Sequence, residues 1–239
     1  MSGPFWDQVR GTTPARIGLT RVGNAIGTGE WLDFGAAHAA ARDAVHRPLD
    51  VQALREQVAA LGVGEPSVVA SAATDRAEYL RRPDLGRLPG HDLDAGAPAD
   101  LAIVIADGLS AEATMRHAAP LLAELLPLLG ATSVGAPVIA TQARVALGDH
   151  LGQALGAGAV LVLIGERPGL SAADSLGGYL TWAPKPGILD SARNCVSNIR
   201  EPGGLTYRAA ARTLASLYIG ARALGATGVD LKDGSNALI

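Results

Sequence analysis

The chain has 239 residues, of which 48% are hydrophobic, so it is long enough for one large domain or two smaller ones with a buried core. Its 20 basic and 23 acidic residues give a net charge of −3 without a block of either sign, which argues against nucleic acid or an anionic membrane surface as a partner. The most apolar long stretch, residues 118–129, contains Glu124 and two prolines and is too short and too broken to span a bilayer.

The N-terminal segment, residues 1–11, lacks the apolar core of a secretory signal peptide. Cys195 is the single cysteine, so the chain cannot form an internal disulfide, which suits a reducing compartment. We therefore expect a soluble protein that stays in the cytoplasm.

The first third of the chain has a helical pattern and few strand signals. Apolar residues recur at spacings of three or four over residues 31–45, which predicts an amphipathic helix. Asp50 is placed to cap a second helix, which should end at Gly62 in a left-handed conformation. After a helical piece around residues 74–80, the Pro-, Gly- and Asp-rich run 81–100 is typical of a linker between two domains.

From residue 101 onward, short apolar runs alternate with helical patterns. We predict strands in the apolar runs 101–106, 137–142, 159–165, 179–183 and 228–232.

The intervening segments are predicted to be helices. Ser110 can cap a helix over residues 111–130, in which Pro120 should cause a kink or start a new helix because it has no N–H. Two further helices are predicted over residues 145–156 and 206–225, the second with its first threonine as the cap.

Strands that are apolar on both faces belong in a parallel sheet covered by helices on each side. The alternation therefore predicts an α/β protein, with a Rossmann-like, doubly wound and mostly parallel sheet over residues 97–239. A smaller helical domain and its linker should precede it over residues 1–96. Ligands of such sheets bind outside the carboxyl ends of the strands, so the polar loop after residue 165 is the candidate site.

Standard catalytic and metal-binding signatures are absent from the sequence. It contains no G-x-S-x-G elbow and no G-x-x-x-x-G-K-[ST] phosphate loop, and the glycines of GAGAVLVLIG precede a strand, whereas those of a dinucleotide fingerprint follow one. The five histidines are scattered and have no cysteine or histidine partner at metal-ligand spacing, so we expect no metal site.

Two segments nevertheless resemble a known family. GERPGLSAADSLGGYLTWAP followed by NCVSNIR is similar to the small subunit of ethanolamine ammonia-lyase, the bacterial enzyme that uses adenosylcobalamin to convert ethanolamine into acetaldehyde and ammonia. The resemblance covers nearly the whole chain, because five other segments follow the family order: TPARIGL, LDFGAAHAAARDAV, YLRRPDLGRLP, ADLAIVIADGLSA and ARVALGDHLG.

The resemblance implies a division of labour between two chains. In that family the large subunit is a TIM barrel that holds the substrate, and the small subunit covers the corrin of the cobalamin from the other side, within a hetero-oligomer. The sequence lacks the D-x-H-x-x-G with which one class of cobalamin proteins places a histidine on cobalt. We therefore expect adenosylcobalamin to bind in its base-on form.

The family's cobalamin contacts fall on three residues that match here: Val145, Glu166 and Cys195. On sequence alone each has another interpretation. Val145 could be a core residue, Glu166 a cap or an ion-pair partner of Arg167 or Arg144, and Cys195 a small buried apolar residue.

The chain offers no recognisable cluster of carboxylates for a cationic substrate, so we assign it no catalytic residue and expect no activity from it alone. Two alternatives remain open: a mainly structural subunit, and a separate Rossmann-like enzyme with an unrecognised site. Some family members carry a longer amphipathic N-terminal extension associated with delivery to a bacterial microcompartment. This chain starts a few residues before TPARIGL, so we expect it in the cytoplasm instead.

Overall fold

A computed structural model of the chain describes residues 4–13, 15–91, 93 and 97–234. Its N-terminal part contains α1 (Pro4–Arg10), β1 (Arg21–Val22), β2 (Ala25–Ile26), α2 (Thr28–His46), α3 (Val51–Ala59), β3 (Ser67–Ala70), α4 (Arg76–Arg81) and η1 (Leu85–Arg87). The remainder contains β4 (Leu101–Ala106), α5 (Ala111–Leu125), η2 (Leu126–Leu129), β5 (Val138–Thr141), α6 (Leu147–Ala154), β6 (Ala159–Gly165), β7 (Leu176–Trp182), η3 (Asp190–Ala192), β8 (Asn194–Ile199) and α7 (Tyr207–Leu224).

A six-stranded sheet with the order β3-β5-β4-β6-β7-β8 forms the centre of the molecule. The first four strands in this order are parallel, and β7 and β8 continue the sheet in antiparallel pairing. A register shift between Leu176 and Gly178 interrupts the pairing of β7 with β8. The prediction of an α/β protein with a mostly parallel sheet is therefore confirmed.

Helices cover both faces of the sheet, as the wholly buried strands β4 and β6 require. Ile103 and Ile105 point to one face, where α3, α5 and α7 complete an apolar core. Ala102 and Val104 point to the other face, where α6 packs. The loops after the neighbouring strands β4 and β5 therefore lead to opposite faces, which opens a crevice at their carboxyl ends.

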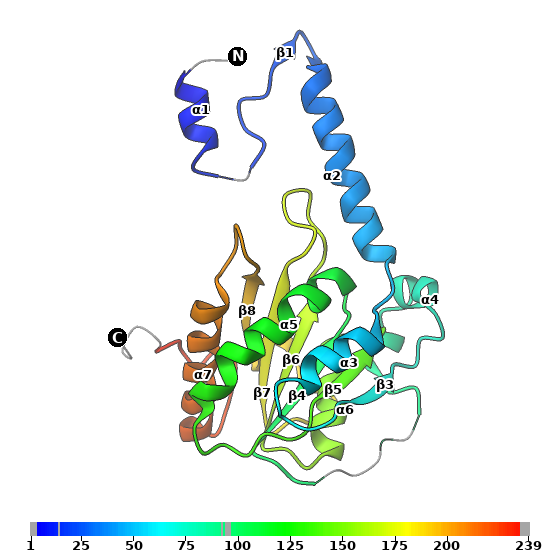
Figure 1. Ribbon diagram of the computed structural model, residues 1–239, viewed down its shortest axis with the longest axis vertical. Helices are drawn as coiled ribbons and strands as arrows, with labels where there is room; N and C mark the ends of the chain where they lie inside the picture. The colour runs from blue at the N-terminus through cyan, green and yellow to red at the C-terminus, as the bar shows by residue number, and fades with distance from the viewer. Residues whose placement is uncertain (1–3, 14, 92, 94–96, 235–239) are drawn as a thin grey trace.

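The segment 4–46, which we call the arm, extends away from the sheet (Figure 1). The predicted amphipathic helix is present as α2, but Ala44 is its only buried residue and both Trp31 and Phe34 are exposed. Residues Ser67–Ala70, which lie between the arm and residue 97, form the edge strand β3. This strand was not predicted from the sequence.

Local signals placed the helix ends well. Asp50, Ser110 and Thr206 each accept a hydrogen bond from a backbone N–H in the first turn of their helix, and Gly225 ends α7 in the left-handed region. α5 runs through Pro120 without restarting; this residue is exposed, so solvent can bind the carbonyl group that loses its partner.

The strand predicted at residues 228–232 is wrong. Leu231 donates to Gly228 in a turn, and the Asn194 side chain binds the carbonyl groups of both residues, so they have no strand partner. β8 was not predicted as a strand, and part of the predicted linker 81–100 lies outside the described residues. None of the helices in the described ranges combines the length and the apolar character needed to cross a membrane.

Candidate functional site

Val145, Glu166 and Cys195 lie around two adjoining hollows at the carboxyl ends of the parallel strands and on the neighbouring face of β7 and β8. Val145 lies between β5 and α6 and lines both hollows. Glu166 follows β6 directly and lines one of them, and Cys195 in β8 lines the other, which has a volume of about 280 Å³. The fold thus brings together three residues that are far apart in sequence.

Cys195 stands on an open part of the sheet. α7 covers one face of β7 and β8, and on the other face, where α6 packs on the neighbouring strands β4 and β6, Cys195 and Ser197 of β8 are exposed. Cys195 pairs across the strands with Tyr179, whereas Val196 points into the core. The interpretation of Cys195 as a buried apolar residue is therefore wrong.

The thiol of Cys195 is neutral at neutral pH. Partial desolvation raises its pKa, and a contact with the Tyr179 hydroxyl lowers it by a smaller amount. Cys195 therefore lacks the lowered pKa that marks a nucleophilic cysteine.

Glu166 joins the ends of three strands. Its carboxylate accepts hydrogen bonds from the Ser175 hydroxyl, from the Ser197 hydroxyl at 2.5 Å and from the Asn198 backbone N–H at 3.1 Å. Its own N–H donates to the Ser175 carbonyl at 2.8 Å. Within the described ranges it forms no ion pair with an arginine, so that interpretation of Glu166 is not supported.

Asp107 fills the crevice between the loops after β4 and β5. Its side chain is 4% exposed and accepts hydrogen bonds from the backbone N–H groups of Gln142 and Ala143 at 2.9 and 3.0 Å. Arg76 approaches the same carboxylate at 3.1 Å. Burial raises the pKa of Asp107, and Arg76 and the two amide groups oppose that shift. The carboxylate therefore links α4, β4 and β5 at the rim of the sheet.

The loop after β5 is fixed from its other side as well. The Tyr79 hydroxyl donates to the Ala143 carbonyl at 2.9 Å, and the Arg144 N–H donates to the Gly86 carbonyl at 2.7 Å. Gln142 has a φ of 54°, a region that residues other than glycine seldom adopt and that persists where the surrounding structure holds it. The contacts around Gln142 hold this strained conformation, so Val145 and its neighbours are presented on a rigid support.

A buried ion pair fixes the start of β8 beside Cys195. The guanidinium of Arg193 contacts both oxygens of Asp149 in α6, at 2.6 and 2.7 Å, and each side chain is 1% exposed. Arg193 also donates to Thr181 in β7 at 2.9 Å. Sequence reasoning missed this pair because nothing local indicates that two residues on different elements will meet.

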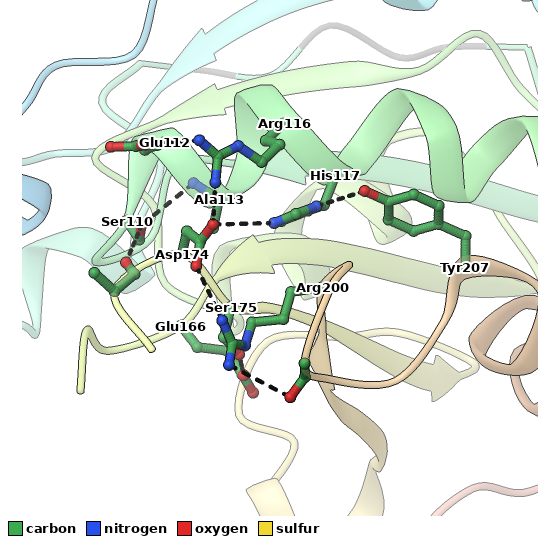
Figure 2. A network of polar contacts seen from close by, with 12 residues as sticks. Ser110, Glu112, Ala113, Arg116, His117, Glu166, Asp174, Ser175, Arg200 and Tyr207 are labelled. Carbon is green, nitrogen blue, oxygen red and sulfur yellow. Dashed lines mark hydrogen bonds and ion pairs between the residues drawn. The ribbon is translucent and has the colours of Figure 1, made fainter. Parts of the chain in front are cut away.

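A second polar network holds the loop between β6 and β7 (Figure 2). Asp174 of that loop receives a hydrogen bond from Arg116 of α5 and lies 3.6 Å from Arg200, just after β8. Nε2 of the buried His117 is 3.7 Å from the same carboxylate, and Nδ1 is 2.7 Å from the Tyr207 hydroxyl. The loop is therefore clamped to α5 and to the start of α7.

Ser110 adds a contact between this loop and the first turn of α5. Its hydroxyl accepts from the Ala113 N–H at 3.2 Å, as Figure 2 shows, and donates to the Ala173 carbonyl at 2.9 Å. Gly165 at the end of β6 lies so close to the Ser110 carbonyl that any side chain there would collide with backbone. At this edge of the candidate site, the backbone at the end of β6 therefore packs directly on the backbone of Ser110, just before α5.

This arrangement suits binding better than chemistry. The described residues contain no group of three or more His, Cys, Asp and Glu side chains that could hold a metal ion. Cys195 is the one residue of the hollows with nucleophilic potential, and its raised pKa and the absence of a histidine among the lining residues argue against that role.

Known proteins are similar to this chain over nearly its whole length. The profile of the family described as ethanolamine ammonia-lyase light chain (EutC) matches residues 4–232. The ethanolamine ammonia-lyase small subunit of Rhodococcus erythropolis is 54% identical over 236 residues, which cover 98% of this chain and 91% of the relative. The small subunit of Bradyrhizobium diazoefficiens is 51% identical over 240 residues, covering 95% and 90% of the two chains, and that of Azotobacter vinelandii is 48% identical over 239 residues, covering 95% and 88%.

These matches extend through every element that builds the two hollows, from α4 to β8. The named relatives are subunits of a carbon–nitrogen lyase. This chain therefore belongs to the ethanolamine ammonia-lyase light-chain family.

Proposed function

We propose that this chain is the small subunit of an adenosylcobalamin-dependent ethanolamine ammonia-lyase, and that its two hollows hold one side of base-on cobalamin against a catalytic large subunit. The observation that carries the proposal is the meeting of Val145, Glu166 and Cys195 around adjoining hollows, in a chain whose relatives bear that name.

The donors and acceptors at the site fit a cobalamin. The corrin is a flat apolar ring with carboxamide groups around its edge, and these groups both donate and accept hydrogen bonds. Arg144 borders both hollows, and its guanidinium forms no hydrogen bond and no ion pair within the described chain, so the donors that face the hollows are available to a ligand. Val145 supplies an apolar contact beside it.

Glu166 keeps a capacity for a ligand even after its internal contacts are counted. A carboxylate can accept about four hydrogen bonds. Three are taken by Ser175, Ser197 and Asn198, which hold the group in place. We assign the remaining position to a carboxamide N–H of the corrin edge, and Cys195 to the ring periphery farther along the same face.

When bound, the cofactor supplies the radical chemistry of the lyase reaction. This chain contributes binding and orientation, because the carboxylates of its hollows, Glu166 and Asp190, are held by internal partners and Cys195 is not an activated nucleophile. We therefore propose that the catalytic groups belong to a large subunit with a TIM-barrel fold in a hetero-oligomer, and that this chain alone is inactive. The Rossmann-like class, the division into residues 1–96 and 97–239, and a cytoplasmic location outside microcompartments stay predictions.

Co-expression with the candidate large subunit tests the proposal. The purified complex should bind adenosylcobalamin with a change in the corrin absorbance and should release ammonia from ethanolamine, whereas this chain alone should do neither at the same concentration. Ammonia release by the single chain, or no cobalamin binding by an intact complex, would contradict the proposal.

The exposed arm favours a second candidate, a subunit whose main role is structural. Trp31 and Leu32 are 61% and 64% exposed, which leaves them free to contact another protein. Glu166→Gln separates the two roles. In a binding subunit it should weaken cobalamin binding by the complex about 10-fold, because the carboxylate acceptor is lost. The control Glu124→Gln removes an exposed carboxylate of α5 outside the hollows and should have no effect. Unchanged affinity in an assembled Glu166→Gln complex would favour the structural role.

A further inference from the structure

The side chain of Arg144 has no hydrogen-bond or ion-pair partner among the described residues, although the backbone around it is held by hydrogen bonds. Among the described residues its guanidinium forms no ion pair and no hydrogen bond, and its Nε atom is fully buried. The flat group stacks on the Tyr79 ring, with its central carbon 4.5 Å from the ring centre. By contrast, Arg76 on the same ring is bound to Asp107. Arg144 is partly buried and its guanidinium is stacked on a fixed ring, so the charge is held at the hollow with donors left for a ligand.

The surroundings of Arg144 favour an anion. Arg87 lines the same 280 Å³ hollow and also lacks a partner in the described chain. The N–H groups of Val145 and Ala146, at the start of α6, donate to no other described residue, and a helix N-terminus favours negative charge. The hollow's carboxylate, Asp190, is bound to Arg193, and the Cys195 thiol beside it is neutral.

We propose that Arg144, assisted by Arg87 and the backbone N–H groups of Val145 and Ala146, binds the phosphodiester of the cobalamin nucleotide tail. The phosphodiester is the formally anionic group of that cofactor, and the planar fork of arginine matches two phosphate oxygens. The inference rests on the proposed function, because it names the part of the same ligand that enters this hollow.

Three corrinoids that differ at the tail provide the test. Cobalamin carries the whole nucleotide, cobinamide phosphate keeps the phosphate without the base, and cobinamide has neither. Each is titrated by absorbance into the complex of this chain with its large subunit. In the Arg144→Gln complex we expect the affinities for cobalamin and for cobinamide phosphate to fall about 10- to 100-fold, and that for cobinamide to change less than about twofold.

Arg144→Lys and Arg212→Gln complete the set. Lysine keeps the charge but loses the planar fork, so it should restore part of the affinity for the two phosphate-bearing ligands only. Arg212 is exposed on α7 and is absent from the hollows, so its replacement controls for the change in net charge and should leave all three affinities unchanged.

Equal loss for all three ligands, loss for cobalamin alone, or no loss would each overturn the assignment of Arg144 to the phosphate. If Arg144→Gln does not assemble, the same comparison in the Arg144→Lys complex decides, and equal affinity changes for cobinamide and cobinamide phosphate would again overturn it. Failure of the unmodified complex to bind any of the three corrinoids would instead refute the proposed function and this assignment with it.

Discussion

The sheet and the arm place their apolar side chains in opposite environments. Every residue of β4 and β6 is buried, whereas Ala44 is the only buried residue of α2 and the large side chain of Trp31 is 61% exposed. Isolated helices are marginal in water unless one face is packed. The stability of this chain therefore resides in the sheet with its covering helices. The helix α2 of the arm depends mainly on the local helical preference of its residues.

The strongest test of this contrast removes a buried charge. Arg193→Met leaves Asp149 buried without a partner, and we expect the free energy of unfolding to fall by about 3–5 kcal/mol. Chemical denaturation measures it. The matched control is Arg82→Met, whose exposed pair with Asp84 should contribute less than about 1 kcal/mol. Equal losses in the two variants would show that burial does not decide how much an ion pair contributes in this chain.

A cavity in the core should come next. Leu163 of β6 is fully buried, so Leu163→Ala should cost about 2–5 kcal/mol in urea unfolding. Leu224→Ala, at an exposed position of α7, should change the same free energy by less than about 0.5 kcal/mol. A small effect at Leu163 would mean that the core collapses around the missing side chain.

The cap at Ser110 should have an intermediate effect. Ser110→Ala removes the cap of α5 and the contact with Ala173, and we expect a loss of about 1–2 kcal/mol, seen as a lower melting temperature. Thr206→Ala removes a comparable cap of α7 and should cost about 1 kcal/mol or less. If amide exchange in the loop between β6 and β7 is faster in Ser110→Ala but not in Thr206→Ala, the hydrogen bond from Ser110 to the Ala173 carbonyl contributes to the order of that loop.

Acid should weaken the network around His117. Burial is the main cause that lowers the pKa of this imidazole, and Asp174 opposes the shift. The unfolded chain therefore binds the proton more readily than the folded protein, so stability is lost as the pH falls below about 6.5. The fall in melting temperature between pH 7 and pH 5 should be smaller in His117→Asn than in the natural sequence. Parallel curves for the two proteins would exclude this contribution.

The smallest effect is expected in the arm. Trp31→Ala removes a large side chain, yet it should change the unfolding free energy of the isolated chain by less than about 0.5 kcal/mol because Trp31 is exposed. A loss of 2 kcal/mol or more would show that the arm packs on the sheet in solution.

The contrast also explains which elements sequence reasoning found. β4 and β6 are fully apolar, and the caps Asp50, Ser110 and Thr206 act through bonds to nearby residues, so local patterns were enough. β3 and β8 were missed because they are edge strands with exposed residues, and their short patterns resemble loops. The turn after Gly228 was mistaken for a strand because its bonds to Asn194 cross the fold.

The candidate site was predicted less completely. The positions of Val145, Glu166 and Cys195 came from the family resemblance, and the sheet rim came from the strand pattern. Their internal partners were not predictable, because Glu166 meets Ser197 and Arg193 meets Asp149 only after β8 has paired with β7. The unpartnered state of Arg144 likewise depends on where every neighbouring carboxylate lies.

The interruption of pairing between Leu176 and Gly178 lies between the two strands whose alignment decides which side chains of β8 reach the surface. Side chains alternate along β8, so Cys195 and Ser197 are exposed while Val196 lies in the core. A slip of β8 by one residue would exchange these roles and bury the thiol. Insertions or deletions near this register shift should therefore change the surface beside the hollows and the packing of the core together, whereas substitutions at Cys195 itself leave the alignment of the two strands intact.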